Sequence, residues 1–129
     1  MTSTFKKYKK IKTALSEFPG VKTYKEFDLL IEIGYHQEQG CPLTIKQLLL
    51  LEIASQATVR RYLVNLVKNG MVRKEESDRD HRSVTLILSH ATVKMLSKHL
   101  LKILEHIKAI HDEALPGHGD HKKKQKAGK

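Results

Sequence analysis

The period of the apolar residues changes abruptly near the middle of the chain, and this change constrains the fold most. Up to Gly70, apolar side chains recur at the spacing of an amphipathic helix. A charged run without any apolar side chain follows from Arg73 to Ser83, and residues 84–88 then alternate in the manner of a β-strand. Any fold for this chain must therefore accommodate a helix followed at once by a polar hairpin.

The helix before this change has a start, a stop and two contrasting faces. Ser55 is expected to cap it and Gly70 to end it, which gives a helix over residues 55–69. Its apolar face carries Val59, Leu63, Leu66 and Val67, with Tyr62 at the edge. The opposite face carries Gln56, Ala57, Arg60, Arg61 and Lys68. Gln can contact adenine and Arg guanine, while small side chains let a helix approach a groove closely, so this face can read DNA. A plain solvated face is the alternative that this helix alone leaves open.

The N-terminal part of the chain predicts two helices. A lysine-dense amphipathic helix is expected over residues 4–18, ended by a Pro-Gly pair. Thr23 lies three residues before Glu26 in a capping-box pattern, which starts a second helix that runs to about residue 37.

A short helix is predicted next. Thr44 and Gln47 repeat the capping-box pattern for a helix through Leu51, whose four consecutive leucines are expected to be mostly buried. Residues 52–54 are expected to form a tight turn into the helix at 55–69. Two helices joined in this way form a helix-turn-helix, in which the second helix enters the major groove by its N-terminal end.

The segment after Gly70 predicts a hairpin. Residues 72–75 and 84–88 are expected to be strands, joined by a polar, turn-rich tip. In the second strand Val84, Leu86 and Leu88 face one side, and Thr85 and Ile87 face the other. A helix-turn-helix followed by a hairpin is a winged helix, and its wing would lie over the backbone or over the minor groove, which attracts arginine.

A long last helix is expected over residues 89–114. Its apolar residues are close to a heptad stripe: Val93, Leu96, Leu100, Leu101, Leu104, Ile107 and Ile110. One small domain can hardly cover so long a stripe, so we expect it to pack partly on the N-terminal helix and partly on a second copy of the chain. An ordinary core-facing helix is the alternative.

Length and charge limit the domain count and the partners. The 129 residues fit one domain, expected over residues 1–114 with a core at 22–88, followed by a flexible basic tail at 115–129. A formal net charge of +10 favours a polyanion such as nucleic acid, although part of the excess lies in the tail. The single cysteine, Cys41, excludes an internal disulfide, and no apolar run predicts a membrane span or a secretory signal. A cytoplasmic protein is expected.

Other chemistry is not predicted. Among the eight histidines, His106 and His111 lie five apart on a helix, which is poor spacing for joint ligation, so neither a metal site nor a cofactor is expected. Cys41 has no adjacent cation in the sequence that would activate it, and an inert thiol is expected. No nucleophile elbow, phosphate-binding glycine loop or HExxH motif is present, so an enzyme is not expected.

Two series of residues form a recognisable pattern. In the hairpin, Asp80 and Arg82 form an Asp-x-Arg sequence, and Leu88 and Ser89 end the following strand. Upstream, the series consists of Leu43, Thr44, Ser55, Thr58, Val59, Leu63, Leu66, Gly70, Val72 and Arg73. With these residues the chain from about Tyr24 to Met95 resembles the MarR family of transcriptional regulators, whose wing signature has Thr where Ser89 stands. Ile53 and Thr92 stand where the family often has glycine, and the first helix is short for the family's dimerisation mode.

The resemblance implies a mainly α winged helix-turn-helix with a small β-hairpin and flanking N- and C-terminal dimerisation helices. It also implies a sequence-specific regulator of double-stranded DNA, a repressor that binds an inverted repeat as a homodimer, with a small-molecule effector in a cleft between the dimerisation helices and the core. A winged-helix adaptor that binds protein or RNA is the alternative, and it predicts an apolar patch in place of the cationic face.

The expected DNA contacts are divided between the helix at 55–69 and the wing at 72–88. In the helix, Gln56, Ala57 and Arg60 are expected nearest the base edges, Ser55 and Thr58 near phosphate, and Arg61 on bases or backbone. In the wing, Arg73 and Lys74 are assigned to DNA. The resemblance implies that Asp80 holds Arg82 and stiffens the wing, while Arg79 reaches the minor groove or phosphates.

Overall fold

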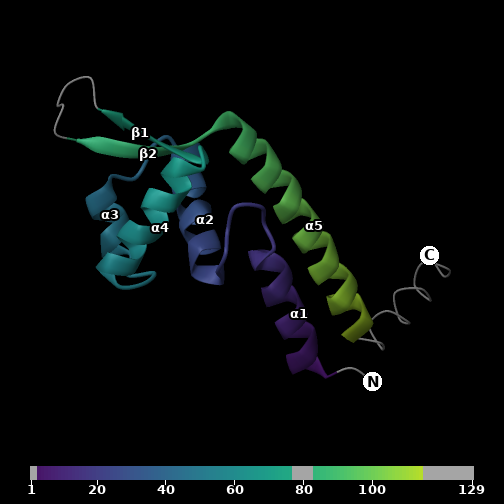
Figure 1. Cartoon of the computed structure of the whole chain (residues 1–129). Coiled ribbons are helices and arrows are strands. Elements are labelled where there is room, and N and C mark those ends of the chain that lie inside the picture. Colours follow the sequence, from purple (N-terminus) through teal and green to yellow (C-terminus); the bar gives the residue numbers. More distant parts are fainter. Residues whose placement is uncertain (1–2, 77–82, 115–129) are drawn as a thin grey trace.

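The computed structural model describes residues 3–76 and 83–114 and has five helices and one hairpin in these ranges. In chain order they are α1 (Thr4–Ser16), α2 (Tyr24–Glu38), α3 (Ile45–Leu50), α4 (Gln56–Lys68), β1 (Val72–Glu76), β2 (Val84–Leu88) and α5 (His90–Ala114). Figure 1 shows α2, α3, α4 and the hairpin gathered at one end, with α1 and α5 extending away from them. The predicted fold class, mainly helical with a small β-hairpin, is confirmed.

The winged-helix core consists of α2, α3, α4 and the hairpin, and its interior is apolar. Leu30 and Ile33 of α2 are fully buried together with Leu48 of α3, Leu66 of α4 and Leu86 of β2. Complete burial of an aliphatic side chain contributes about 1.5–3 kcal/mol. These four leucines and Ile33 therefore fix the relative positions of the three helices and the hairpin.

Helix caps determine where the core helices begin. Thr23, Thr44 and Ser55 each accept a hydrogen bond from the backbone N–H three residues later. The predicted capping box of α3 is complete, because Gln47 Oε1 also accepts from Thr44 N at 2.9 Å. The predicted box of α2 is incomplete: the Glu26 carboxylate accepts instead from Lys22 N at 2.9 Å and from Asn65 Nδ2 at 3.3 Å. Glu26 thereby joins the start of α2 to α4.

The segment between α2 and α4 departs from the prediction in its burial. Of the four leucines, Leu48 and Leu49 are buried, but Leu50 is 68% exposed and Leu51 is 42% exposed. A single short helix turns only part of its circumference to the core, so consecutive leucines cannot all be buried. The tight turn that follows contains Glu52 with φ of 54°, a left-handed conformation that is uncommon for a residue with a side chain.

The hairpin packs on the end of α4. Gly70, with φ of 77°, turns the chain after α4, and Val72 then pairs with Leu88 in an antiparallel ladder that ends at Glu76 and Val84. The second strand has the predicted bounds, and the first is one residue longer than predicted. Leu86 N also donates to Leu43 O at 2.8 Å, so the loop before α3 borders the hairpin.

The junction between β2 and α5 contains a single residue, Ser89. Its backbone N–H donates to Met71 O at 3.0 Å, and its Oγ accepts from Thr92 N at 3.2 Å, which caps α5. Leu88 N donates to Gln37 Oε1 of α2 at 2.7 Å. The strand and the helix are thus joined without a loop and are bonded to both neighbouring segments.

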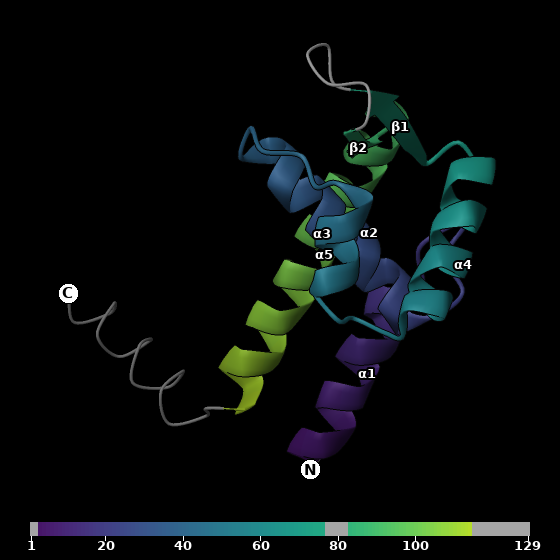
Figure 2. The same ribbon diagram turned by 90° about the vertical axis from the view of Figure 1, so that its left-hand side faces the viewer.

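The terminal helix pair, α1 and α5, lies side by side and antiparallel (Figures 1 and 2). The first helix ends at Ser16 and not at the predicted residue 18, because Phe18 leaves the helix and is buried against Phe27 and His99, with ring centroids 6.1 and 5.3 Å away. In α5, Ile103 is 4% exposed, which the predicted stripe omitted.

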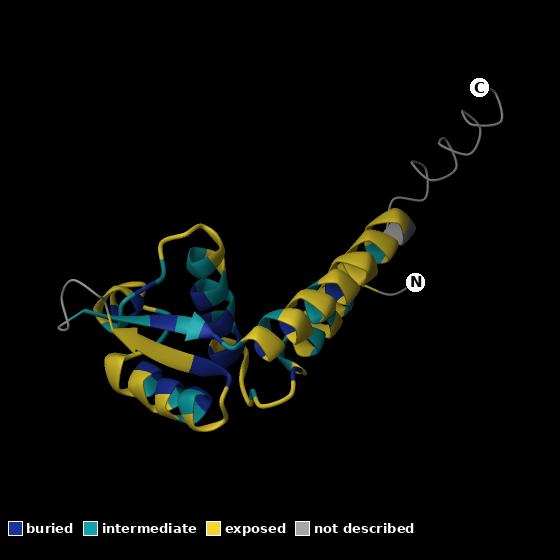
Figure 3. Ribbon diagram, turned by 90° about the horizontal axis from the view of Figure 1, so that it is seen from above, coloured by how far each residue is buried: buried dark blue, intermediate teal, exposed yellow. Residues whose placement is uncertain are grey.

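Much of the terminal helix pair is exposed, as the yellow ribbon in Figure 3 shows. Its exposed apolar residues are Phe5, Tyr8, Met95, Leu101, Leu104 and Ile107. The predicted stripe of α5 is therefore divided: Leu96 is buried within the chain, whereas Leu104 is 59% exposed. No helix within residues 3–76 and 83–114 combines the length and apolar character needed to span a membrane.

Candidate nucleic-acid interface

Helix α4 presents a polar and cationic face to solvent. All five predicted outward residues of this face are exposed: Gln56, Ala57, Arg60, Arg61 and Lys68. On the opposite face, Val59, Leu63 and Leu66 are buried against the core. The helix is therefore held by one side while its other side is open to a ligand, which is the arrangement required of a groove-reading helix.

The first turn of α4 carries a hydroxyl pair. Ser55 Oγ accepts from Thr58 N at 3.2 Å and donates to Thr58 Oγ1 at 2.9 Å. Both side chains, which the sequence assigned to phosphate, thus participate in the helix cap. The Thr58 hydroxyl retains a proton that it can donate to a phosphate oxygen.

Val64 belongs to the same outward face, although the sequence interpretation did not include it. It follows Arg60 and Arg61 by one helical turn and is 66% exposed. On a helix that enters the major groove, an exposed apolar side chain at this position would suit the methyl group of thymine. The available signal was its spacing from the two arginines, which places all three residues on one face.

A cavity of about 420 Å³ opens along one flank of α4, between this helix and the start of α2. Its lining residues are Lys22, Thr23, Glu26, Arg61, Tyr62, Val64, Asn65 and Lys68. The Arg61 guanidinium carbon lies 5.6 Å from the centre of the Tyr62 ring, a cation–π contact between two residues of the lining. Lys22 was not predicted as a site residue, since nothing in the sequence indicates its proximity to α4.

The described part of the wing contains one predicted DNA contact that is paired with an acid. Arg73 Nη2 lies 2.7 Å from Glu75 Oε2 on the same strand, and both side chains are exposed. Lys74 is exposed on the adjacent position of β1. The predicted wing residues Arg79, Asp80 and Arg82 lie outside the described residues.

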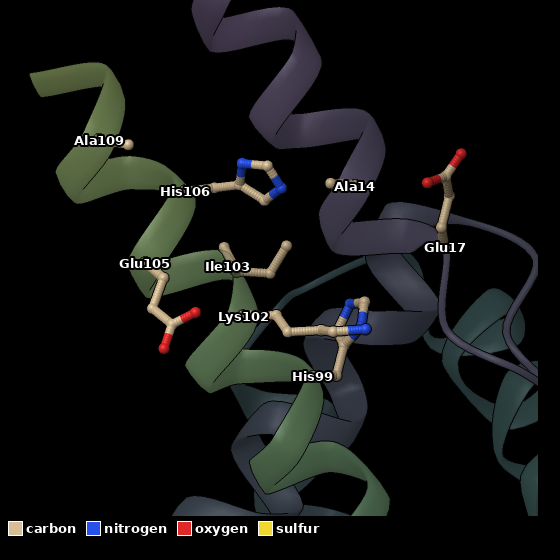
Figure 4. A pocket seen from close by; sticks show the side chains of 8 residues that line it. All are labelled: Ala14, Glu17, His99, Lys102, Ile103, Glu105, His106 and Ala109. Carbon is tan, nitrogen blue, oxygen red and sulfur yellow. The ribbon is translucent and has the colours of Figure 1, made fainter. Parts of the chain in front are cut away.

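A second cavity, of about 510 Å³, lies between α1 and α5 and is drawn in Figure 4. Its lining residues are Ala14, Glu17, His99, Lys102, Ile103, Glu105, His106 and Ala109. His99 Nε2 is buried and has no hydrogen-bond partner among the described residues, while its ring contacts Phe18 and Phe27. All of its lining residues belong to α1, to Glu17 that follows it, or to α5, so this cavity lies within the terminal helix pair and not in the expected cleft between that pair and the core.

Metal ligands do not gather in the described ranges. Within residues 3–76 and 83–114, no group of three or more His, Cys, Asp or Glu side chains could hold an ion. Cys41 is exposed in the loop after α2.

Comparison with known proteins finds solved structures of similar architecture. No family model and no curated protein sequence matches this chain. A mutant of MepR from S. aureus bound to an oligodeoxyribonucleotide is similar over 97% of this chain and 91% of its own, with a TM-score of 0.69 and 15% identity. MepR bound to ethidium bromide is similar over 95% of this chain and 84% of its own, with a TM-score of 0.64 and 17% identity.

A third solved structure is the multiple antibiotic resistance repressor, MarR. It is similar over 88% of this chain and 78% of its own, with a TM-score of 0.69 and 18% identity. At such low sequence identities the similarity shows a shared backbone fold. The chain therefore has the winged-helix fold of MepR and MarR, as its resemblance to the MarR family predicted.

Proposed function

We propose that this protein is a DNA-binding transcriptional regulator that inserts α4 into the major groove, with the β1–β2 hairpin as its wing. The observation that carries the proposal is the exposed face of α4, which is polar in its first turn and cationic further along. The fold supports it, because a MepR structure with the same architecture contains an oligodeoxyribonucleotide.

The roles of individual residues follow from their place on α4. Gln56, Ala57 and Arg60 lie toward its N-terminal end and contact base edges. The wing contacts the neighbouring backbone or minor groove through Lys74 and the tip residues Arg79 and Arg82, with Asp80 orienting Arg82. Arg73 contributes less charge to DNA than Lys74, because Glu75 pairs with it.

The regulator acts as a homodimer through the terminal helix pair. Leu101, Leu104 and Ile107 lie on one side of α5 and are exposed in the single chain, while Ile103 on another side is buried. The pair extends away from the core, so the core of the same chain does not cover these residues (Figure 3). A second copy that contributes the same stripe provides a self-complementary apolar surface.

Two recognition helices related by a two-fold axis bind an inverted repeat, with half-sites about one helical turn apart. The protein works as a repressor, as the printed name of MarR suggests. A cytoplasmic location is part of the same proposal. The cavity between α1 and α5 receives a small-molecule effector, a role supported by the ethidium complex of MepR.

The test is selection of binding sites from random duplexes with purified protein, followed by footprinting. We expect an inverted repeat, and Arg60→Ala is expected to cost about 1–3 kcal/mol of binding and to relax specificity. Lys94→Ala, an exposed cation on α5, is the matched control. Partner binding that is insensitive to salt, without selection of any duplex, would contradict the proposal and favour the adaptor.

A further inference from the structure

The cavity between the start of α2 and α4 is cationic, and it has no role among the contacts proposed above for α4 and the wing. We infer that it binds a backbone phosphate of the DNA, with Lys22 as a contact from outside the helix-turn-helix. This inference rests on the proposed function. In this arrangement Arg61 and Lys68 contact the sugar-phosphate backbone of the DNA. Arg60 is then the arginine of α4 that contacts bases.

The cavity brings together three cations from two distant segments. Lys22 precedes α2, whereas Arg61 and Lys68 are seven residues apart on α4 and therefore lie on one side of it, two turns from each other. All three side chains are exposed, so they can reach a ligand. A volume of about 420 Å³ has room for a phosphate group with its hydration.

The carboxylate in the cavity wall does not oppose an anion strongly. Glu26 is 1% exposed, and its two oxygens accept from Lys22 N and from Asn65 Nδ2. Its charge is thus directed to donors in the wall and is outnumbered by the three cations. Glu26 is a positioning residue, because it holds the backbone of Lys22 at a fixed place beside α4.

The start of α2 adds further attraction for an anion. This 15-residue helix begins at Tyr24, and the partial positive charge of its N-terminus faces the same region as Lys22. Thr23 Oγ1 accepts from Glu26 N at 3.1 Å and retains its hydroxyl proton for a phosphate oxygen. Cations, a helix terminus and a hydroxyl together form a site for a phosphate oxygen.

The position of the cavity favours phosphate of the DNA backbone over a free ion. It opens along the flank of the helix that the proposed function places in the groove, and Val64 belongs both to its lining and to the groove-reading face. A helix in the major groove has a sugar-phosphate strand along each flank, and contacts to those strands fix its register.

The experiment compares Lys22→Ala with Lys25→Ala in the full-length protein. Lys22→Ala retains the backbone N–H that donates to the Glu26 carboxylate. Lys25 is an exposed cation three residues away that does not line the cavity. Affinity is measured at several salt concentrations for a selected site and for a random duplex of roughly three helical turns. Lys22→Arg tests rescue by charge.

For Lys22→Ala we expect the same fold loss of affinity on both duplexes, and a slope of log affinity against log salt that is shallower by about 0.9. Lys25→Ala should change the slope less, and Lys22→Arg should restore it. Equal slopes for Lys22→Ala and Lys25→Ala, in a wild-type protein that binds DNA, would overturn this inference alone. A wild-type protein that binds no duplex would overturn the proposed function as well.

One further arm separates the two sources of phosphate. Inorganic phosphate is titrated into the DNA-free protein at constant ionic strength, and the backbone signals of residues 22–26 are followed by NMR. Weak or absent binding of the free ion by wild-type protein, together with the slope change on DNA, supports the inference. A response to the free ion that Lys22→Ala abolishes, without any change on DNA, overturns it.

Discussion

The winged-helix core and the terminal helix pair are built from the same kind of amphipathic helix, yet they differ in how their apolar residues are covered. In the core, Leu30 and Leu66 are fully buried by other elements of the chain. In the terminal helix pair, Leu104 and Phe5 remain largely exposed. The core is complete within one chain, whereas the terminal helix pair has apolar surface that its own chain does not cover.

This contrast shows what helical periodicity specifies. Apolar residues spaced three and four positions apart indicate that one side of a helix is apolar, but they do not indicate which element covers that side. Contiguous exposed apolar surface in a monomer marks an interaction site. The two regions should therefore respond differently to equivalent substitutions, and the following predictions compare them.

The largest difference is expected between Leu30→Ala and Leu104→Ala. Leu30→Ala leaves a cavity in the core and should lower the free energy of unfolding by about 2–5 kcal/mol at any protein concentration. Leu104→Ala removes an exposed side chain and should affect stability only where dimers are present. Urea unfolding at low and high protein concentration measures both. Equal losses for the two variants at low concentration would contradict the comparison.

The double variant Leu104→Lys/Ile107→Lys should disrupt the dimer and leave the core folded. Two buried ammonium groups in an apolar interface are costly to desolvate. Sedimentation should show a monomer where the wild type is a dimer, while circular dichroism remains helical. Lys46→Glu, an exposed charge change on α3 outside the terminal helix pair, is the control and should leave the sedimentation unchanged. A wild-type protein that sediments as a monomer would remove the dimer from the proposal.

At the boundary between the two regions, His99→Phe should raise the free energy of unfolding by about 1–2 kcal/mol. The substitution removes the buried Nε2, which has no partner among the described residues, and retains a ring against Phe18 and Phe27. Chemical denaturation of both proteins measures the difference. A loss of stability would indicate that Nε2 is hydrogen-bonded in the dimer.

The smallest expected difference concerns two helix caps. Thr44→Ala removes a complete capping box in the core and should lower the free energy of unfolding by about 1 kcal/mol. Ser3→Ala removes the cap of α1, where Ser3 Oγ accepts from Lys6 N, and should only increase local fraying at the start of that helix. Hydrogen exchange resolves local from global opening. A global loss from Ser3→Ala would show that the two regions unfold as one unit.

Much of the fold could be predicted because its signals are local. The caps at Thr44 and Ser55 and the alternation of residues 84–88 each depend on neighbours within a few positions. The outward face of α4 was predicted for the same reason, since its residues are related by helical spacing. The exposure of these residues was therefore readable from the sequence, whereas their contacts with DNA stay predictions.

The remaining errors concern contacts between distant segments. Glu26 was assigned to a local capping box, but its carboxylate bonds to Asn65, 39 residues away. Lys22 was overlooked because only the packing of α2 on α4 brings it beside α4. Phe18 was placed inside α1, although burial against His99 of α5 draws it out of the helix. No pattern among neighbouring residues indicates contacts between segments so far apart in the sequence.

The single-residue junction between β2 and α5 makes the strand and the helix parts of one rigid strut. Ser89 bonds to Met71, and Leu88 bonds to Gln37, so the strut cannot turn without moving the base of the wing and α2. In a dimer joined through α5, the crossing angle of two such struts sets the separation of the two recognition helices. Any change that widens or narrows this crossing angle would then change the half-site spacing that the dimer can bind.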